Sequence, residues 1–159
     1  MDIFKPIAKF ILDPLYALHE KSSHRRLLKE YERTQYMSQE KIVEQQFLLL
    51  KNILIHAYKN CHFYKEKFDA ISFDPNKFSS IDEIKKIPIL TKKDIQQNFD
   101  NLTARNYSEN QLLLNQTGGS TGSPLKFYVD LQRLHSRKAS TFRHDRWAGW
   151  DIGTKTAVL

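Results

Sequence analysis

The most informative segment of the chain is Gln116-Thr117-Gly118-Gly119-Ser120-Thr121-Gly122-Ser123-Pro124-Leu125. Its three glycines allow the backbone to curl and to approach a ligand closely. Four hydroxyl side chains lie within the seven residues 117–123. Backbone N–H groups in such a curl form a concave nest for anions, and serine and threonine hydroxyls add further donors. The segment therefore predicts a loop that binds phosphate, although a polar hairpin loop or linker has a similar composition.

The sequence on both sides of this loop is apolar and typical of strands. Residues 111–115 and 125–129 are the two strand candidates. The Walker A pattern fails because Gly122 is followed by Ser-Pro rather than Lys-Ser/Thr, and the dinucleotide pattern GxGxxG fails at residues 118–120. Both of those loops lead from a strand into a helix, whereas this loop joins two strands. Anion binding here would depend on loop amides and hydroxyls rather than on a helix dipole.

The N-terminal part of the chain has helical periodicity. Residues 2–20 carry apolar side chains at helical spacing, interrupted by two prolines, and residues 22–36 form a charged helical segment. Ser38 is the expected N-cap of a long helix. We expect the apolar stripe of that helix to lie in the core. The stripe comprises Ile42, Gln46, Leu49, Leu50, Ile53, Leu54 and Ala57.

Shorter elements follow toward the loop and beyond it. Ser80 predicts the cap of a short helix over 81–86, and Thr91 opens a helix to about Phe99 through a capping box. After the second strand, residues 131–147 predict a basic helix, and residues 156–159 predict a further strand. The fold class expected is α/β.

The balance of charge is basic. The chain of 159 residues has a net charge of +7 and a single cysteine, Cys61. A lone thiol forms no internal disulfide and fits a reducing compartment, and no His/Cys cluster has metal-ligand spacing. We therefore expect no metal site held by protein ligands. Basic charge favours anionic partners, and it is densest at Arg133, Arg137, Lys138, Arg143 and Arg146.

Four segments resemble one branch of a known superfamily. Residues 117–124, Thr-Gly-Gly-Ser-Thr-Gly-Ser-Pro, resemble the signature loop of adenylate-forming enzymes. Residues 61–68, 87–95 and 146–153 resemble segments of the phenylacetate–CoA ligase-like and CapK-like (coenzyme F390 synthetase-like) branch, in the same order and spacing. The resemblance covers about residues 40–159.

The resemblance implies a reaction and a set of binding residues. A carboxylate attacks the α-phosphate of ATP with Mg²⁺, giving an acyl-adenylate and pyrophosphate, and a thiol such as coenzyme A then takes the acyl group. The CapK-like members imply a place in capsular polysaccharide biosynthesis. The residues carried over to phosphate binding are Thr117, Gly118, Gly119, Ser120, Thr121 and Gly122. Lys126 is a weaker candidate, because many members place lysine directly after the loop proline and a shift of one residue turns a strand side chain to the opposite face.

The resemblance also implies what these residues lack. Residues 1–40 form a helical extension, and 41–159 form part of the N-terminal, AMP-binding domain, with helices packed on a partial mixed sheet. The adenine-binding segment, the ribose-binding aspartate and the catalytic lysine of the family would follow residue 159. We therefore predict no catalytic residue in this piece and no adenylation by it alone. Because an incomplete sheet leaves open edges, we also expect self-association.

Two non-catalytic alternatives remain open from the sequence. The basic helix 131–147 could belong to a nucleic-acid-binding module, although we expect nucleotide and acid substrates rather than nucleic acid as partners. Residues 2–20 could lie on a membrane surface. The first residues lack a signal-peptide pattern and no apolar run reaches the roughly 20 residues of a membrane span, so we expect a cytoplasmic location without a transmembrane segment.

Overall fold

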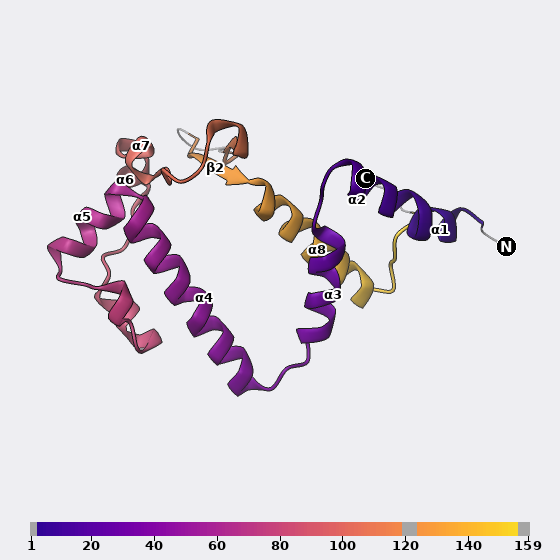
Figure 1. Cartoon of the computed structure of the whole chain (residues 1–159), viewed down its shortest axis with the longest axis horizontal. Coiled ribbons are helices and arrows are strands. Elements are labelled where there is room, and N and C mark those ends of the chain that lie inside the picture. Colours follow the sequence, from indigo (N-terminus) through magenta and orange to yellow (C-terminus); the bar gives the residue numbers. More distant parts are fainter. Residues whose placement is uncertain (1–2, 119–123, 156–159) are drawn as a thin grey trace. The chain divides into compact units, whose positions relative to one another are not determined.

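The computed structural model describes residues 3–118 and 124–155. Its contacts divide the chain into two compact units, which we call unit 1 (Met1–Tyr36 with Asp130–Leu159) and unit 2 (Met37–Val129). Most of the described residues are helical (Figure 1). The sheet among them has two strands, β1 (Leu112–Gln116) and β2 (Lys126–Asp130). The α/β class is confirmed, with helices predominating.

Unit 1 contains the first helices of the chain and the last. Its elements are α1 (Phe4–Ile7), the π-helical turn η1 (Ala8–Leu12), α2 (Asp13–His19), α3 (His24–Thr34) and α8 (Leu131–Trp147). The predicted helix 131–147 is confirmed as α8, and the Asp130 side chain caps it by accepting a hydrogen bond from the Arg133 N–H. The predicted strand over residues 156–159 lies outside the described residues.

Helices α3 and α8 pack on each other to form the core of unit 1. Leu27 and Leu28 of α3 meet Ala139 of α8, which is completely buried. The small alanine side chain lets the two helices approach closely, and Tyr31 packs beside it while its hydroxyl bonds the Ser136 Oγ at 2.8 Å.

One position of unit 1, residue 153, requires glycine for a steric reason. Gly153 has a φ of +83°, and a Cβ placed there would lie 2.8 Å from the Cα of Lys5. Only glycine fits this backbone conformation beside α1 without strain.

Unit 2 is built around one long helix. Its elements are α4 (Gln39–Asn60), α5 (His62–Ala70), η2 (Pro75–Lys77), η3 (Ile81–Lys86), α6 (Lys92–Gln97), α7 (Phe99–Leu102), η4 (Glu109–Gln111), β1 (Leu112–Gln116) and β2 (Lys126–Asp130). Ser38 is the N-cap of α4, as predicted, although its side chain makes no capping hydrogen bond.

Aromatic side chains fill the core of unit 2. Leu54 of α4 meets Phe68, Phe73 and Phe78, and both Phe68 and Phe78 are 1% exposed. The Phe78 ring stacks on Phe47 with centroids 5.5 Å apart. Fully burying one such ring stabilises the fold by about 1.5–3 kcal/mol.

The prediction that the whole stripe of α4 lies in the core is wrong in part. Leu50 and Leu54 pack into the core, but Leu49 is 60% exposed and Ile53 is 58% exposed. A helix of 22 residues presents more apolar surface than α5 and the segment after it cover within this unit.

The two predicted strands are confirmed, each displaced by one residue. They pair as a two-stranded antiparallel sheet, and the loop between them joins strand to strand. The described sheet is therefore smaller than the mixed sheet expected from the resemblance.

Candidate functional site

The glycine- and hydroxyl-rich loop leaves β1 at Thr117 and enters β2 after Leu125. The Thr117 N–H donates to the Leu125 carbonyl at 2.9 Å, and the Leu125 N–H donates to the Thr117 Oγ1 at 3.0 Å. These two bonds close the base of the loop. Thr117 Oγ1 accepts one of them and keeps its own proton to donate elsewhere.

The described part of the loop is open around its glycine. A Cβ placed at Gly118 would meet no heavy atom within 4 Å. The Gly118 backbone is therefore accessible to a ligand. The other predicted phosphate-binding residues, Gly119, Ser120, Thr121 and Gly122, lie outside the described residues.

Lys126 lies at the exit of the loop, at the start of β2. Its side chain is exposed and lines a cavity of about 230 Å³ with Pro124 and Leu125. The opposite side of this cavity is formed by Ile95, Gln96 and Phe99 of α6 and α7. A ligand at the loop exit would thus meet the Lys126 side chain, the Gln96 amide and several apolar side chains.

An aromatic contact holds the hairpin of β1 and β2 against the helices of unit 2. The Tyr128 ring of β2 lies against Phe99 of α7 with centroids 5.1 Å apart. In a strand, residues two apart share a face, so Lys126 and Tyr128 point to the same side. This side is the one toward α6 and α7, and it places Lys126 beside the cavity.

Two segments that carry the family resemblance pack together in unit 2. Phe63, Tyr64 and Lys67 of α5 line a small cavity with residues 87–90. The following helix α6 begins at the predicted capping box, in which Thr91 Oγ1 accepts from the Asp94 N–H at 3.1 Å and Asp94 Oδ2 accepts from the Thr91 N–H at 2.9 Å. Phe63 and Phe68 of this aromatic segment are buried and anchor α5 to the core of unit 2.

The fourth resembling segment, residues 146–153, belongs to unit 1 and forms an ion-pair cluster. The Arg146 guanidinium bonds Glu32 of α3 and lies 3.0 Å from the Asp151 carboxylate, and Lys9 Nζ lies 2.5 Å from Asp151. Burial alone would raise the pKa of Asp151, but hydrogen bonds from Lys9 and the Ile152 N–H, together with Arg146, hold that pKa below its usual value. The cluster therefore ties η1, α3 and the turn after α8 together.

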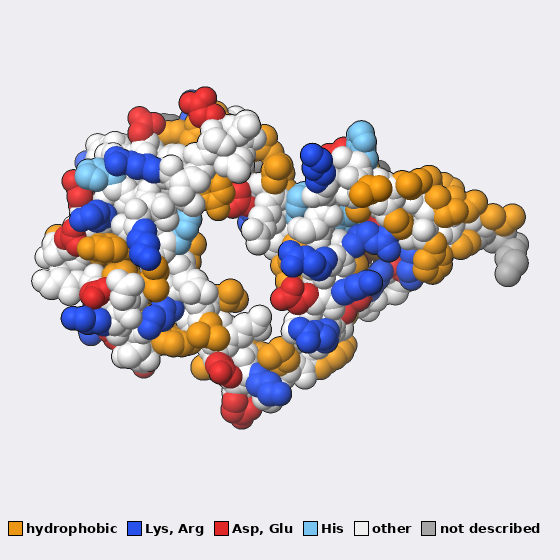
Figure 2. All heavy atoms as spheres, in the orientation of Figure 1, with side chains coloured by type: hydrophobic (Ala, Val, Ile, Leu, Met, Phe, Trp, Pro, Cys, Tyr) orange, Lys and Arg blue, Asp and Glu red, His pale blue; other side chains and the backbone are white. Residues whose placement is uncertain are grey.

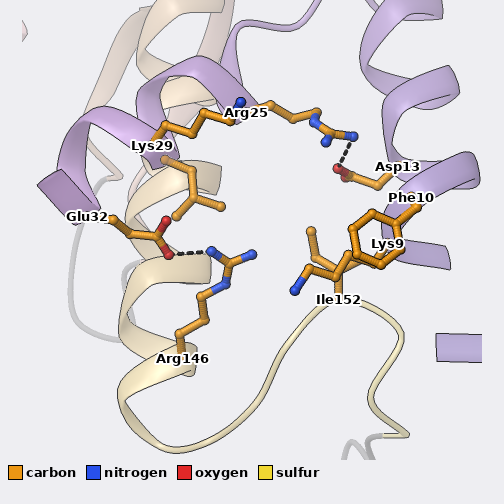
Figure 3. Close-up of a pocket in the computed structure, with 9 residues that line it drawn as sticks. Lys9, Phe10, Asp13, Arg25, Lys29, Glu32, Arg146 and Ile152 are labelled. Carbon is orange, nitrogen blue, oxygen red and sulfur yellow. Dashed lines mark hydrogen bonds and ion pairs between the residues drawn. The ribbon is translucent and has the colours of Figure 1, made fainter. Parts of the chain in front are cut away.

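This cluster borders a cavity of about 320 Å³ (Figure 3). Its charged lining residues come from three parts of unit 1 and are Lys9, Asp13, Arg25, Lys29, Glu32 and Arg146. Figure 3 shows the Arg25–Asp13 and Arg146–Glu32 pairs on its rim. No local sequence pattern predicts this cavity, because Glu32 and Arg146 on its lining are separated by 114 positions.

Three cations of the predicted basic cluster are engaged inside unit 1. Arg146 is ion-paired, Lys138 Nζ lies 4.1 Å from the centroid of the Tyr16 ring, and Arg143 lies 5.1 Å from that of Trp147. Arg133 and Arg137 are exposed. Three of the five cationic side chains thus make contacts inside unit 1. The absence of a nucleic-acid partner stays a prediction.

The described residues show neither a cluster of metal ligands nor a membrane-spanning helix. Across residues 3–118 and 124–155, no group of three or more His, Cys, Asp or Glu side chains is placed to hold a metal ion. In that part of the chain, no helix is long and apolar enough to cross a bilayer.

Comparison with known proteins gives partial matches. No family model matches the chain. It is 35% identical over 75 residues to the phenylacetate-coenzyme A ligase of Escherichia coli (strain K12), a match that covers 47% of this chain and 17% of that protein. It is also 34% identical over 80 residues to the protein CapK of Staphylococcus aureus, covering 50% of this chain and 17% of CapK.

The chain therefore spans only about a sixth of the length of these two relatives, 17% in each case. The similarity is local, and it falls on about half of this sequence. It supports an origin related to the acyl-CoA ligases and is consistent with the adenylate-forming family.

Proposed function

We propose that this chain is the N-terminal part of an ATP-dependent, AMP-forming enzyme that activates a carboxylic acid, and that the loop 117–124 holds the phosphates of the nucleotide. The observation that carries the proposal is the position of this loop. It joins two paired strands, its base is closed by two hydrogen bonds at Thr117, and its first glycine is open to a ligand. The local similarity to a phenylacetate-coenzyme A ligase supports the same reading.

The loop residues would act by donating hydrogen bonds to phosphate oxygens. When a carboxylate attacks the α-phosphate, negative charge moves onto the leaving pyrophosphate. Donors fixed in advance around that charge lower the barrier. Within the proposal, backbone N–H groups of residues 117–122 and the hydroxyls of Thr117, Ser120 and Thr121 are these donors.

Lys126 would add a positive charge at the loop exit. Its side chain lines the same cavity as Pro124 and Phe99. A flexible lysine serves as a point charge for phosphate rather than a fixed fork. We therefore assign Lys126 a supporting contact, and the loop amides and hydroxyls the main one.

The proposed cofactors are ATP and Mg²⁺, with coenzyme A as the thiol acceptor. The name of the first relative, phenylacetate-coenzyme A ligase, gives phenylacetate and coenzyme A for that protein. For this chain, they are part of the proposal. Mg²⁺ would be held mainly by phosphate oxygens, as in phosphoryl transfer generally.

The proposal is tested by titrating the 159-residue chain with Mg²⁺–pyrophosphate in a calorimeter. We expect saturable binding, and we expect Thr121→Val to weaken it at least about tenfold, because a hydrogen bond to a charged group contributes about 1.5–3 kcal/mol. The matched control is Thr103→Val, an equal change at a hydroxyl that bonds the Phe99 carbonyl outside the loop. Equal affinities of the two variants, or no binding by the unchanged chain, would contradict the proposal.

A further inference from the structure

The first helical segment of unit 1 exposes large apolar side chains along one face. We call this set the apolar face; its members are 39–77% exposed, and they are Ile3, Ile7, Phe10, Ile11, Leu15 and Leu18. Their spacing of mostly three and four residues places them on one side of a helix. In Figure 2, hydrophobic side chains cover most of the visible face of this N-terminal segment.

The other side of the same segment is docked on unit 1. Ala8, Asp13 and Ala17 are buried, and Asp13 bonds His24 of α3. Ala8 and Asp13 are five residues apart, and the Asp13 N–H donates to the Ala8 carbonyl across the π-helical turn η1. This i→i+5 hydrogen bond places the two residues on nearly the same side of the segment. The docked side is thereby fixed. Most of the apolar face points away from it, whereas Phe10 also borders the cavity of unit 1.

The charge of unit 1 complements an anionic surface. Residues 1–36 and 130–159 contain 13 Lys and Arg against eight Asp and Glu, whereas residues 37–129 contain 12 against ten. Exposed cations of unit 1 include Lys5, Lys21, Arg26 and Lys29. Figure 2 shows Lys and Arg side chains gathered beside the hydrophobic segment.

We propose that residues 3–18 form an interfacial helix that docks unit 1 on an anionic lipid surface. A helix with one strongly apolar face, positively charged surroundings and insufficient length to span lies in the plane of the interface, with its apolar side chains below the headgroups. Lysine and arginine near the headgroups add attraction to anionic lipid. A second copy of the chain is a poorer occupant, because two like-charged units would have to meet. This inference does not depend on the proposed function of the loop.

Vesicle co-sedimentation of the 159-residue chain tests the inference. The probes are vesicles of phosphatidylcholine mixed with phosphatidylglycerol, and vesicles of phosphatidylcholine alone. We expect binding to the mixed vesicles that weakens as salt is added, since surface electrostatics are screened. No binding to the mixed vesicles, or equal binding to both kinds, would overturn it.

A matched pair of double variants assigns the binding to the apolar face. Ile7→Asp with Ile11→Asp places two charges on this face, and we expect at least about tenfold weaker vesicle binding. The control is Leu49→Asp with Ile53→Asp, the same change at the same i,i+4 spacing on exposed positions of α4. We expect the control to bind as the unchanged chain does, and equal binding by both variants would refute the assignment.

A fluorescence readout separates lipid from a second copy as the occupant. Phe10→Trp is expected to show, relative to the unchanged chain, tryptophan emission that shifts to the blue only when mixed vesicles are added. Tyr36→Trp, at a position 85% exposed, serves as the control that does not shift. Blue-shifted emission at position 10 without vesicles, together with a mass that rises with concentration, would show a self-covered face and overturn the proposal.

Discussion

His24 is fully buried at the centre of a polar cluster in unit 1. Its Nδ1 lies 2.8 Å from Ser22 Oγ and its Nε2 lies 3.1 Å from the Asp13 carboxylate. Burial lowers the pKa of His24 below 6.5; the hydrogen bond to Asp13 opposes this, and the charges of Lys138 and Arg25 add to it. Neutral histidine is therefore the form that the fold stabilises.

The pH dependence of stability follows from this pKa. In the unfolded chain His24 binds a proton near pH 6.5, and in the folded chain it does so only at lower pH. The unfolded state thus binds more protons in that range, so the free energy of unfolding falls as pH decreases below about 6.5. We expect denaturant titrations to show this loss already above pH 5, before the carboxylates with lowered pKa values titrate. His24→Gln is the control, and it should flatten the dependence of the unfolding free energy on pH between about pH 5 and 6.5. An unchanged pH dependence in this variant would contradict the assignment to His24.

The candidate phosphate loop could be proposed from sequence because its residues are consecutive. Thr117 and Gly118 stand in one motif, and their strand-to-strand setting follows from the apolar residues on each side. Contacts such as Arg146 with Glu32 could not be predicted, since only the packing of α3 on α8 brings them together. Side chains far apart in sequence carry no local signal of their pairing.

At the scale of elements, local rules predicted the helix starts well. The capping boxes at Ser80 and Thr91 are both present, although residues 81–86 form a 3₁₀ helix. Which face of α4 is covered could not be read from periodicity, because Leu49 and Leu50 are equally apolar and only tertiary packing distinguishes them. Periodicity predicts an element, while burial depends on its neighbours.

The aromatic core of unit 2 predicts a steep cost for shortening Phe68. This side chain contacts Tyr58, Tyr64 and Phe73. We expect Phe68→Ala to lower the free energy of unfolding by about 3–5 kcal/mol, through lost burial and a cavity. Leu49→Ala, at an exposed position of α4, should change it by less than about 0.5 kcal/mol. Urea denaturation measures both variants, and similar losses of unfolding free energy for Phe68→Ala and Leu49→Ala would show that Phe68 is not part of the core.

At the scale of the whole molecule, the resembling segments fall in both units. Residues 61–68, 87–95 and the loop belong to unit 2, and 146–153 belong to unit 1. The division of the chain at residue 40 into an extension and a domain stays a prediction, as does self-association. The small extent of the described sheet could not be foreseen, because the expectation of a mixed sheet came from whole relatives and the chain covers 17% of each.

We predict that the 159-residue chain alone does not form an acyl-adenylate. We assign none of these 159 residues to the ribose or to catalysis, so a nucleotide held at the loop would lack the groups that align it for reaction. The measurement is pyrophosphate release from ATP and Mg²⁺ with a panel of aryl and fatty acids. Turnover above the rate without protein would show that these residues already suffice.

Phosphate binding by the loop 117–122 can be measured residue by residue by nuclear magnetic resonance of the isotopically labelled chain. Amide resonances would be followed while Mg²⁺–pyrophosphate is added. We predict saturable shifts concentrated at Thr117, Gly118 and the four residues that follow, with smaller changes at Lys126 and none in α3. Loop amides that stay fixed while resonances elsewhere move, or no movement at all, would contradict it.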